Sequence, residues 1–508
     1  MVHDHPNACC HALGPPINKL EETAMQYTLK LAARSAAIAL AGLVAFSIPA
    51  SGRANPRDDV PAGGLDQRFG YAGIASTPLS PASADRFLAV TVGEDGQTYA
   101  AGFVTLGTDQ AMAVARIAPD GSLDKTFDGD GIGIVNVAVG GTTAEIARGV
   151  AVQSTGKVVV GGPMEHDPTA TGDAARDTDI ALSRFDPDGT LDPTFGEGGT
   201  ARFDFGPGVV LPPTPPSTTP GFRGDTMWGV TTLADDRIVV VAAKRAPGAD
   251  RTDNDFALVL LTEDGDLDTD FGTGGIVTID IDGGNESPRQ AIVQPDGMIV
   301  MAGYSSKSGV VIPQLVRVDD SGELDSSFGA GGIASAQLLP AVAEAYDVAM
   351  QGDNFIITGY GRATATEEVD LIAARFKANG AWDRSFGNAG LVRIDIAGEA
   401  DRGRDLVVFP DGRVLIAGSG KPSATDINGM IVMLNRNGSL DRSFGRDGIL
   451  MVDLGGPADS FFGSALTLDG KKAMVTGYRG SDLASVAPGD DARVVRVRKV
   501  RRTRSFSR

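Results

Sequence analysis

Seven carboxylates that could take part in binding or catalysis stand at corresponding points of a repeated pattern, each just before an apolar stretch. They are Asp85, Glu145, Asp225, Glu286, Glu344, Asp401 and Asp459. Aligned on the following Gln or its equivalent, six of them share one offset and Glu344 is a residue closer. If the apolar stretches line a common channel, the acids would ring its mouth and concentrate cations or cationic ligands. No cofactor is otherwise implied, and Ca²⁺ is the ion that such oxygen ligands suit.

A structural role for the same acids is the alternative to a binding role. Three of the acids are followed three residues later by an arginine, namely Arg148, Arg289 and Arg404, and this spacing favours local ion pairs. Carboxylates in such loops also accept hydrogen bonds from backbone N–H groups between repeat units. The spacing alone does not separate an acidic binding ring from seven loop anchors.

Other catalytic groups are scarce. Both cysteines and three of the four histidines fall within the first 11 residues, which leaves His166 as the one histidine beyond them. A Ser-His-Asp or Cys-His arrangement and a zinc site are therefore not expected. Paired carboxylates could still cleave a glycan, because acidic residues are abundant.

The strands that position the seven acids belong to repeat units marked by a sequence motif, Leu-Asp-x-x-Phe-Gly-x-x-Gly, which recurs every 57 to 76 residues. We call this motif the phrase. Its copies begin at Leu65, Leu123, Leu191, Leu267, Leu324, Trp382 and Leu440. A fixed phrase at such a period is typical of a repeat architecture. Its Asp can accept backbone N–H bonds within its own loop, and its Leu and Phe can seal a seam between units. Cation binding by the seven aspartates is the alternative, although the Asp-x-Asp-x-Asp-Gly calcium loop is missing.

Each repeat unit contains four short strand candidates. Hairpins such as residues 290–303 turn at Pro-Asp-Gly, where Gly297 is expected to adopt the left-handed conformation. Four antiparallel strands per unit predict one blade of a propeller. The first unit supplies only a final strand and the last unit lacks one, so we expect an all-β, seven-bladed β-propeller closed by an N-terminal strand that completes the last blade. A β-solenoid is the alternative.

The alternation of this phrase with Gln-Pro-Asp-Gly-x-Ile-Val-x-Ala-Gly resembles the delta-60 repeat family of bacterial propeller-like proteins. The resemblance extends from about Leu65 to Val500, with Asp128 in place of a motif Gly and Trp382 in place of Leu. It implies a propeller fold and export, and it implies no activity, because the family is largely uncharacterised.

The N-terminal residues are typical of export. From Met25, the predicted true start, a basic segment with Lys30 and Arg34 precedes an apolar stretch of about 14 residues, too short to span a membrane comfortably. Cleavage is expected near Gly52 or Ala54. The predicted organisation is an N-terminal extension with signal peptide (1–54), a seven-unit propeller (55–500) and a basic C-terminal tail (501–508). The mature protein would be periplasmic or extracellular.

Charge and loop length limit the classes of partner. The net charge of −20 disfavours nucleic-acid binding. Variable loops on a rigid scaffold are frequent binding sites, and the longest excursions here are residues 163–178, 206–224, 244–254, 359–369 and 478–490. We therefore expect an exported, monomeric, non-catalytic scaffold that binds a partner protein, a cell-envelope polysaccharide or a cation through its variable-loop face. A carboxylate-dependent glycan hydrolase or lyase is the alternative.

Overall fold

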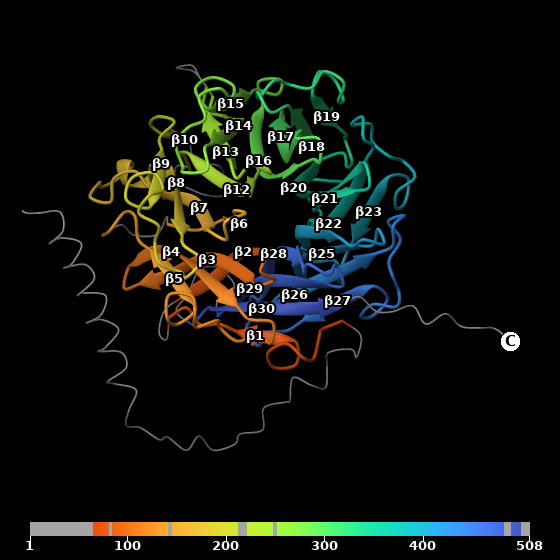
Figure 1. Cartoon of the computed structure of the whole chain (residues 1–508). Coiled ribbons are helices and arrows are strands. Elements are labelled where there is room, and N and C mark those ends of the chain that lie inside the picture. Colours follow the sequence, from red (N-terminus) through yellow and green to blue (C-terminus); the bar gives the residue numbers. More distant parts are fainter. Residues whose placement is uncertain are drawn as a thin grey trace, which may run out of the picture. The chain divides into compact units, whose positions relative to one another are not determined.

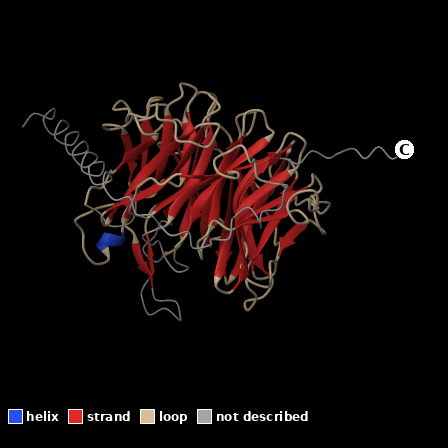
Figure 2. Cartoon of the chain, turned by 90° about the horizontal axis from the view of Figure 1, so that it is seen from below, coloured by secondary structure: helices blue, strands red, loops and turns tan. Residues whose placement is uncertain are grey.

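The computed structural model describes residues 64–80, 84–140, 145–211, 221–246, 251–481 and 489–498. They belong to one unit, Asp59–Arg508. The predicted signal peptide and the basic tail at 501–508 lie outside the described residues. Within the described ranges the regular structure is almost entirely β-strand, and the one helix is a 3-10 turn, η1 (Ala174–Arg176) (Figure 2).

Most strands form groups of four in which consecutive strands pair antiparallel. The first strands of the groups are β2 (Asp85–Val92), β6 (Gly149–Val152), β12 (Thr226–Thr232), β16 (Asn285–Val293), β20 (Val342–Gln351), β24 (Arg402–Val408) and β28 (Ser460–Leu466). The second strands are β3 (Thr98–Leu106), β7 (Val158–Glu165), β13 (Ile238–Arg245), β17 (Ile299–Lys307), β21 (Asn354–Arg362), β25 (Val414–Ser423) and β29 (Lys472–Arg479).

The third and fourth strands complete each group of four. The third strands are β4 (Asp109–Ile117), β8 (Thr178–Phe185), β14 (Asn254–Leu261), β18 (Val310–Val318), β22 (Asp370–Phe376), β26 (Asp426–Leu434) and β30 (Asp491–Arg498). The fourth strands are β5 (Ile132–Val135), β9 (Thr200–Phe203), β15 (Ile276–Ile279), β19 (Ile333–Ser335), β23 (Leu391–Ile394), β27 (Ile449–Val452) and β1 (Ile74–Ser76). The prediction of four-stranded antiparallel units is thus confirmed.

Three pairings depart from simple chain order. The fourth strand beside β30 is β1, which pairs with it antiparallel through Ile74↔Val495 and Ser76↔Arg493. One parallel bridge, Val311↔Val342, joins two neighbouring groups into an eight-stranded sheet. The strands β10 (Val209–Leu211) and β11 (Gly221–Arg223) form a separate two-stranded ribbon.

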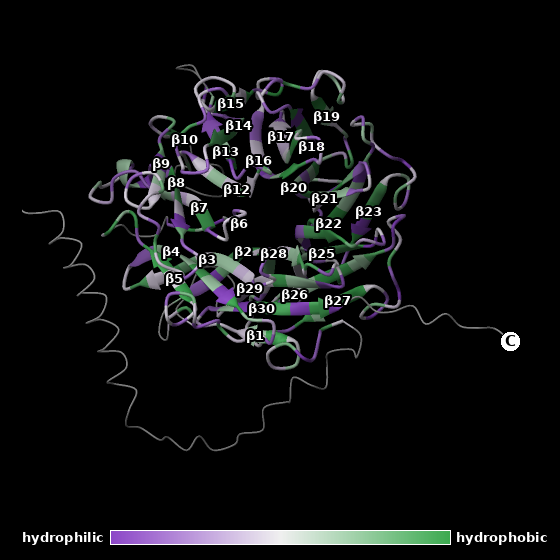
Figure 3. Cartoon of the chain, viewed as in Figure 1, coloured by the Kyte–Doolittle hydropathy of each residue, from purple (hydrophilic) through white to green (hydrophobic). Residues whose placement is uncertain are grey.

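The sheets lie side by side around a common axis, with the first strands nearest to it (Figure 1). The second and third strands are sandwiched between neighbouring sheets, so both of their faces are buried; every residue of β4 and β7 is buried. Their central residues are therefore mostly apolar on both faces, whereas β2 alternates buried and half-buried residues. In Figure 3 the hydrophobic colour accordingly concentrates in the strands and the hydrophilic colour in the loops.

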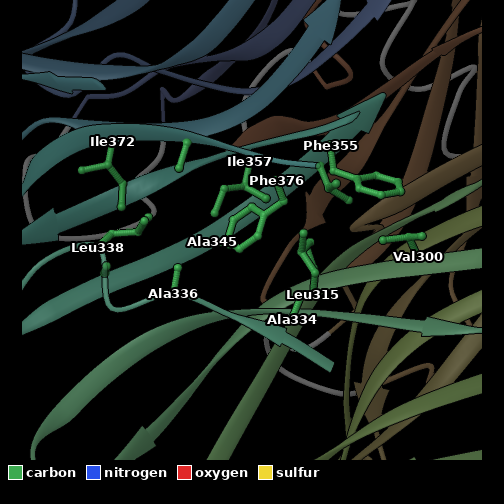
Figure 4. Close-up of a cluster of buried hydrophobic side chains, with 14 of the residues drawn as sticks. Val300, Leu315, Ala334, Ala336, Leu338, Ala345, Phe355, Ile357, Ile372 and Phe376 are labelled. Atoms are coloured by element: carbon green, nitrogen blue, oxygen red, sulfur yellow. The ribbon is translucent and has the colours of Figure 1, made fainter. Parts of the chain in front are cut away.

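The core consists of apolar layers between adjacent sheets. Figure 4 shows one layer, in which Val300 and Leu315 of one group meet Phe355, Ile357 and Ile372 of the next. The Phe328 and Phe355 rings pack edge to face, with centroids 5.7 Å apart. Because each layer takes side chains from two sheets, no sheet buries its apolar surface alone.

The recurring phrase forms the connection between third and fourth strands, and its aspartate closes an Asx turn. In all seven copies Oδ1 accepts the N–H of the residue two positions later, at 2.9–3.3 Å, and the aspartates concerned are Asp66, Asp124, Asp192, Asp268, Asp325, Asp383 and Asp441. The predicted turn role of this residue is confirmed. The Pro-Asp-Gly turn is confirmed as well, since Gly297 has a φ of +87°.

The other carboxylate oxygen of the phrase binds an arginine, and in five copies this arginine also contacts the neighbouring group of strands. In five copies the arginine comes from the third strand and lies 4.6–5.1 Å from the ring of the buried phrase phenylalanine. Its Nη1 also donates to a backbone carbonyl in the next group. These arginines are Arg116, Arg184, Arg317, Arg375 and Arg496. We call this arrangement the Asp–Arg–Phe latch.

The Arg375 latch shows the geometry. Its Nε donates to Asp383 at 2.7 Å, and its Nη1 donates to Gln351 at 2.7 Å and to the Arg436 carbonyl at 3.0 Å. Burial opposes ionisation of Asp383, but hydrogen bonds from Ser385 and Arg375 outweigh it and lower the pKa of Asp383 to about 2.

We expect Arg375→Ala to destabilise the protein by about 2–4 kcal/mol, because it leaves Asp383 without its main cation and removes the bond to the next sheet. The urea midpoint measures the change. Lys471→Ala is the control, since its ion pair with Asp469 leaves the two side chains 73% and 50% exposed, and a cost within about 0.5 kcal/mol is expected. Equal costs for the two variants would contradict the latch.

Candidate functional site

Six of the seven predicted site acids are buried, and the carboxylates of five of them accept hydrogen bonds from backbone N–H groups. These five are Asp85, Glu145, Asp225, Asp401 and Asp459, each at most 1% exposed. Asp459 Oδ2 accepts from Leu454 at 2.5 Å and Oδ1 accepts from Gly480 at 3.3 Å. Equivalent bonds reach the other four. These five carboxylates anchor the loops that lead into the first strands. This is the structural role that was the alternative to a binding role for these acids.

Burial governs the ionisation of these anchors. It raises the pKa of Asp85 to about 6 and that of Glu145, Asp225, Asp401 and Asp459 to about 7, although the backbone N–H bonds favour the charged form. Cation binding by the ring of acids stays a prediction.

Glu286 is the buried acid without such a bond. No hydrogen bond of normal geometry reaches either of its carboxylate oxygens from the described residues. Burial and the charges of Asp255 and Asp280 raise its pKa to about 8, and the nearby Ile281 backbone N–H opposes this rise only in part. Ligand atoms of Asp253, Asp255 and Glu286 lie within 4.8 Å of one another. Arg251 already supplies a positive charge there, through ion pairs with both aspartates.

Two further groups of ligand atoms have the same compactness. They are His166, Asp179 and Asp204, and Asp370, Asp395 and Asp401. In the first, His166 Nδ1 lies 2.9 Å from Asp179 Oδ1, and the hydrogen bond with Asp179 raises the pKa of His166. In the second, the Arg393 guanidinium contacts Asp370. Ca²⁺ at any of these places is likewise a prediction.

Glu344, which lies inside β20, differs from the other six acids because it stands one residue closer to the Gln-equivalent position on which the seven acids are aligned. Successive side chains of a strand point to opposite faces, so this offset turns Glu344 away from the loop-anchoring position. Burial raises its pKa, while hydrogen bonds from Tyr360 and Tyr304 and the charges of Arg289 and Arg404 oppose that rise. Glu344 thus belongs to a cluster of tyrosines and arginines.

That cluster is built on β-bulges in the first strands. Register shifts mark a bulge in β2, β12, β16, β20, β24 and β28. A bulge adds one residue to a strand and redirects its side chain. The bulged residues are Leu88, Trp228, Arg289, Tyr346, Arg404 and Phe462, and Arg148 stands at the corresponding point directly before β6.

Six of these residues alternate cation and ring around the axis, and we call them the arginine–aromatic arc: Arg148, Trp228, Arg289, Tyr346, Arg404 and Phe462. The Trp228 ring lies 4.3 Å from the guanidinium carbon of Arg148 and 3.8 Å from that of Arg289. The Tyr346 ring lies 4.5 Å from Arg289 and 4.7 Å from Arg404. Such cation–π contacts stabilise charges that are partly desolvated.

The arginines of the arc carry charge that no described carboxylate neutralises by an ion pair. The Nε atoms of Arg148, Arg289 and Arg404 are buried without a hydrogen-bond partner among the described residues. Arg289 donates to Ser287, to the Tyr304 hydroxyl at 3.0 Å and to the Tyr346 hydroxyl at 3.4 Å. Burial and the charges of Arg289 and Arg404 lower the pKa of Arg148 to about 10. The expectation that these arginines pair with the acids three residues before them is therefore wrong.

A cavity of about 350 Å³ is lined by residues of the first strands, several of which directly follow an arc member in the sequence. Its lining includes Asp347, Asp405 and Ser464, each one or two residues beyond an arc member. Asp347 Oδ2 accepts the Leu406 N–H at 2.7 Å, and the Ser464 hydroxyl donates to Asp405. These acids join neighbouring first strands, and burial raises the pKa of both, that of Asp347 to about 7.

We expect the protein to lose stability as the pH rises from about 4 to about 7, because Asp347 and Asp405 hold protons in the folded state that they release when unfolded. Asp405→Asn should flatten this slope by at least about 1 kcal/mol, the worth of roughly one pKa unit. Urea unfolding across that range is the measurement, with the exposed Asp353→Asn as control. An unchanged slope in Asp405→Asn would show that the pair does not hold the protons.

Comparison with known proteins identifies the fold. A model of a β-propeller domain of unknown function matches residues 94–127, 153–195, 294–328 and 410–444. Similar solved structures include polysaccharide lyase Uly1 (11% identity, 89% of this chain and 95% of that chain, TM-score 0.44) and a streptogramin B lyase (11%, 83% and 97%, TM-score 0.42). Another is Sqt1 of Chaetomium thermophilum bound to the N-terminus of ribosomal protein L10 (12%, 84% and 99%, TM-score 0.41).

At these TM-scores and identities the likeness carries no functional argument. No curated protein matches the sequence. Among the described residues no helix is long and apolar enough to cross a membrane. The family match and the four-stranded sheets together establish that the chain carries a β-propeller domain.

Proposed function

We propose that the chain is an exported, monomeric, non-catalytic β-propeller scaffold that binds an anionic group of a protein or a cell-envelope polysaccharide. The observation that carries the proposal is the arginine–aromatic arc. Three guanidiniums without ion pairs, in a chain of net charge −20, are costly unless a negative ligand compensates them. The arc stands where the loops enter the first strands, on the side of the variable loops, where ligands commonly bind.

The scaffold itself is proposed as seven blades of the delta-60 type, closed by β1. Besides the β1–β30 pairing, contacts between the last and first groups support closure. Arg86 pairs with Asp490 at 2.5 Å, the Ala492 N–H donates to Asp85 at 2.7 Å, and the Gly70 N–H donates to the Asp120 carbonyl at 2.7 Å.

Closure predicts a specific cross-link. Ala75 and Val494 are directly opposed in the β1–β30 ladder, and opposed Cα atoms of antiparallel strands, about 4.5–5.5 Å apart, permit a disulfide. Ala75→Cys/Val494→Cys, made in a Cys9→Ser/Cys10→Ser background, should form an intramolecular disulfide on oxidation that alters mobility in a denaturing gel. Neither single-cysteine variant should do so. A double variant that stays reduced, or that links two chains, would refute closure within one chain.

The enzyme alternative, a carboxylate-dependent glycan hydrolase or lyase, is less favoured. The acids that line the cavity, Asp347 and Asp405, are engaged by a backbone N–H and a serine hydroxyl of the neighbouring strands. That engagement suits a structural role better than proton transfer to a glycan.

The proposed function is tested with one polymer in three charge states. In affinity electrophoresis we expect dextran sulfate or carboxymethyl-dextran to retard the protein, and neutral dextran to leave its mobility unchanged. Replacing Arg148, Arg289 and Arg404 together by Gln should abolish the retardation. Because the acidic body repels polyanions, retardation would report a local site. Equal mobility in all three gels would rule out anion binding.

A further inference from the structure

The three arginines of the arc come from alternate sheets. Arg148 precedes β6, Arg289 lies in β16 and Arg404 lies in β24, and the aromatic residues between them come from β12 and β20. Arg148 and Arg289 share the Trp228 ring, while Arg289 and Arg404 share the Tyr346 ring. The guanidiniums therefore approach the axis from three directions rather than from one side.

The guanidinium carbons of the arc lie 3.8–5.1 Å from the centroids of the aromatic rings, and such cation–π contacts do not use the N–H donors of the arginines. No hydrogen bond or ion pair joins Arg148 or Arg404 to a described residue. The indole N–H of Trp228 is also buried without a partner among the described residues. Arg148, Trp228 and Arg404 thus present N–H donors without matching acceptors. A buried donor without an acceptor costs free energy.

The shape of the cluster discriminates between anions. A carboxylate presents two oxygens in one plane, which matches a single guanidinium fork. A phosphate or sulfate group presents oxygens in several directions and so suits donors that converge from three sides. The described polar side chains that face the arginines include Glu344 and the hydroxyls of Ser287, Tyr304, Tyr346 and Tyr360, and Glu344 is the one acid among these. One carboxylate does not balance three guanidiniums.

We infer that the arc is a binding site for a tetrahedral oxyanion, the phosphate or sulfate group of the ligand, held by the N–H donors of Arg148 and Arg404 and the indole N–H of Trp228, with the positive charge of Arg289 beside them. This inference rests on the proposed function and specifies the anion. Free ions and sugar monoesters offer the same chemistry at the site. An arc that serves only to pack the first strands against one another would bind neither.

The test is calorimetric titration of the full chain, at constant ionic strength, with phosphate, sulfate, glucose 6-phosphate, glucose 6-sulfate and acetate. We expect saturable binding of at least one tetrahedral anion and none of acetate. Arg148→Gln and Arg404→Gln should each weaken that binding roughly 10-fold or more, as expected for a lost charge-assisted hydrogen bond. Tighter binding of the esters than of the free ions would indicate that the group belongs to a larger ligand.

Arg384→Gln is the matched control, because Arg384 is an exposed arginine stacked 3.6 Å from the Trp382 ring outside the arc. It removes the same charge and the same type of contact, and wild-type affinity is expected. Arg404→Lys keeps the charge without the fork and should fall between Arg404→Gln and wild type, even if the Gln variant folds poorly. Far-ultraviolet circular dichroism verifies each fold.

The outcomes separate the two claims. Acetate or carboxymethyl-dextran binding as tightly as the tetrahedral anions would overturn the inference and leave the proposed function standing. Binding of no anion would overturn both. A folded Arg404→Gln variant with wild-type affinity for sulfate and phosphate would also overturn the inference, because the binding would then lie elsewhere.

Discussion

At the junctions between neighbouring sheets, a third-strand arginine is held by a phrase aspartate, lies over a buried phenylalanine and donates to a carbonyl of the next sheet. Each part constrains the others. The Asx turn orients the carboxylate, the carboxylate orients the guanidinium, and the guanidinium fixes the distance to the next sheet. Found in five of the seven copies, these latches join each of those groups to the next one at the end of the third strand.

The alternation of side-chain directions along a strand determines which acids anchor loops and which side chains face the axis. Acids such as Asp401 precede the bulge by three residues and anchor loops, whereas Glu344 precedes it by two and faces the arginines. A one-residue offset thus converts a loop anchor into a member of the axial cluster. The bulges place Arg289 against rings from the two neighbouring groups of four strands, contacts that a regular strand would not make.

Much of the fold is local in sequence and was therefore predictable. The Asp of the phrase bonds two residues ahead, and Gly297 turns a hairpin whose two strands are adjacent in the chain. The seven acids could be found by their spacing, but their burial could not, because it depends on loops that fold over them. The arc was missed for a similar reason. Its contacts join residues of different repeat units, such as Arg404 and Tyr346, and a β-bulge leaves no mark in the apolar pattern.

The central claim, that the unpaired arginines form an anion site on the axis, is tested most directly by anomalous diffraction from crystals grown with tungstate, a heavy tetrahedral oxyanion. The account predicts one strong anomalous peak among the guanidiniums of Arg148, Arg289 and Arg404, and its loss in crystals of Arg404→Gln. Well-ordered wild-type crystals with no peak at the arc, or with tungstate bound only at other arginines, would contradict it.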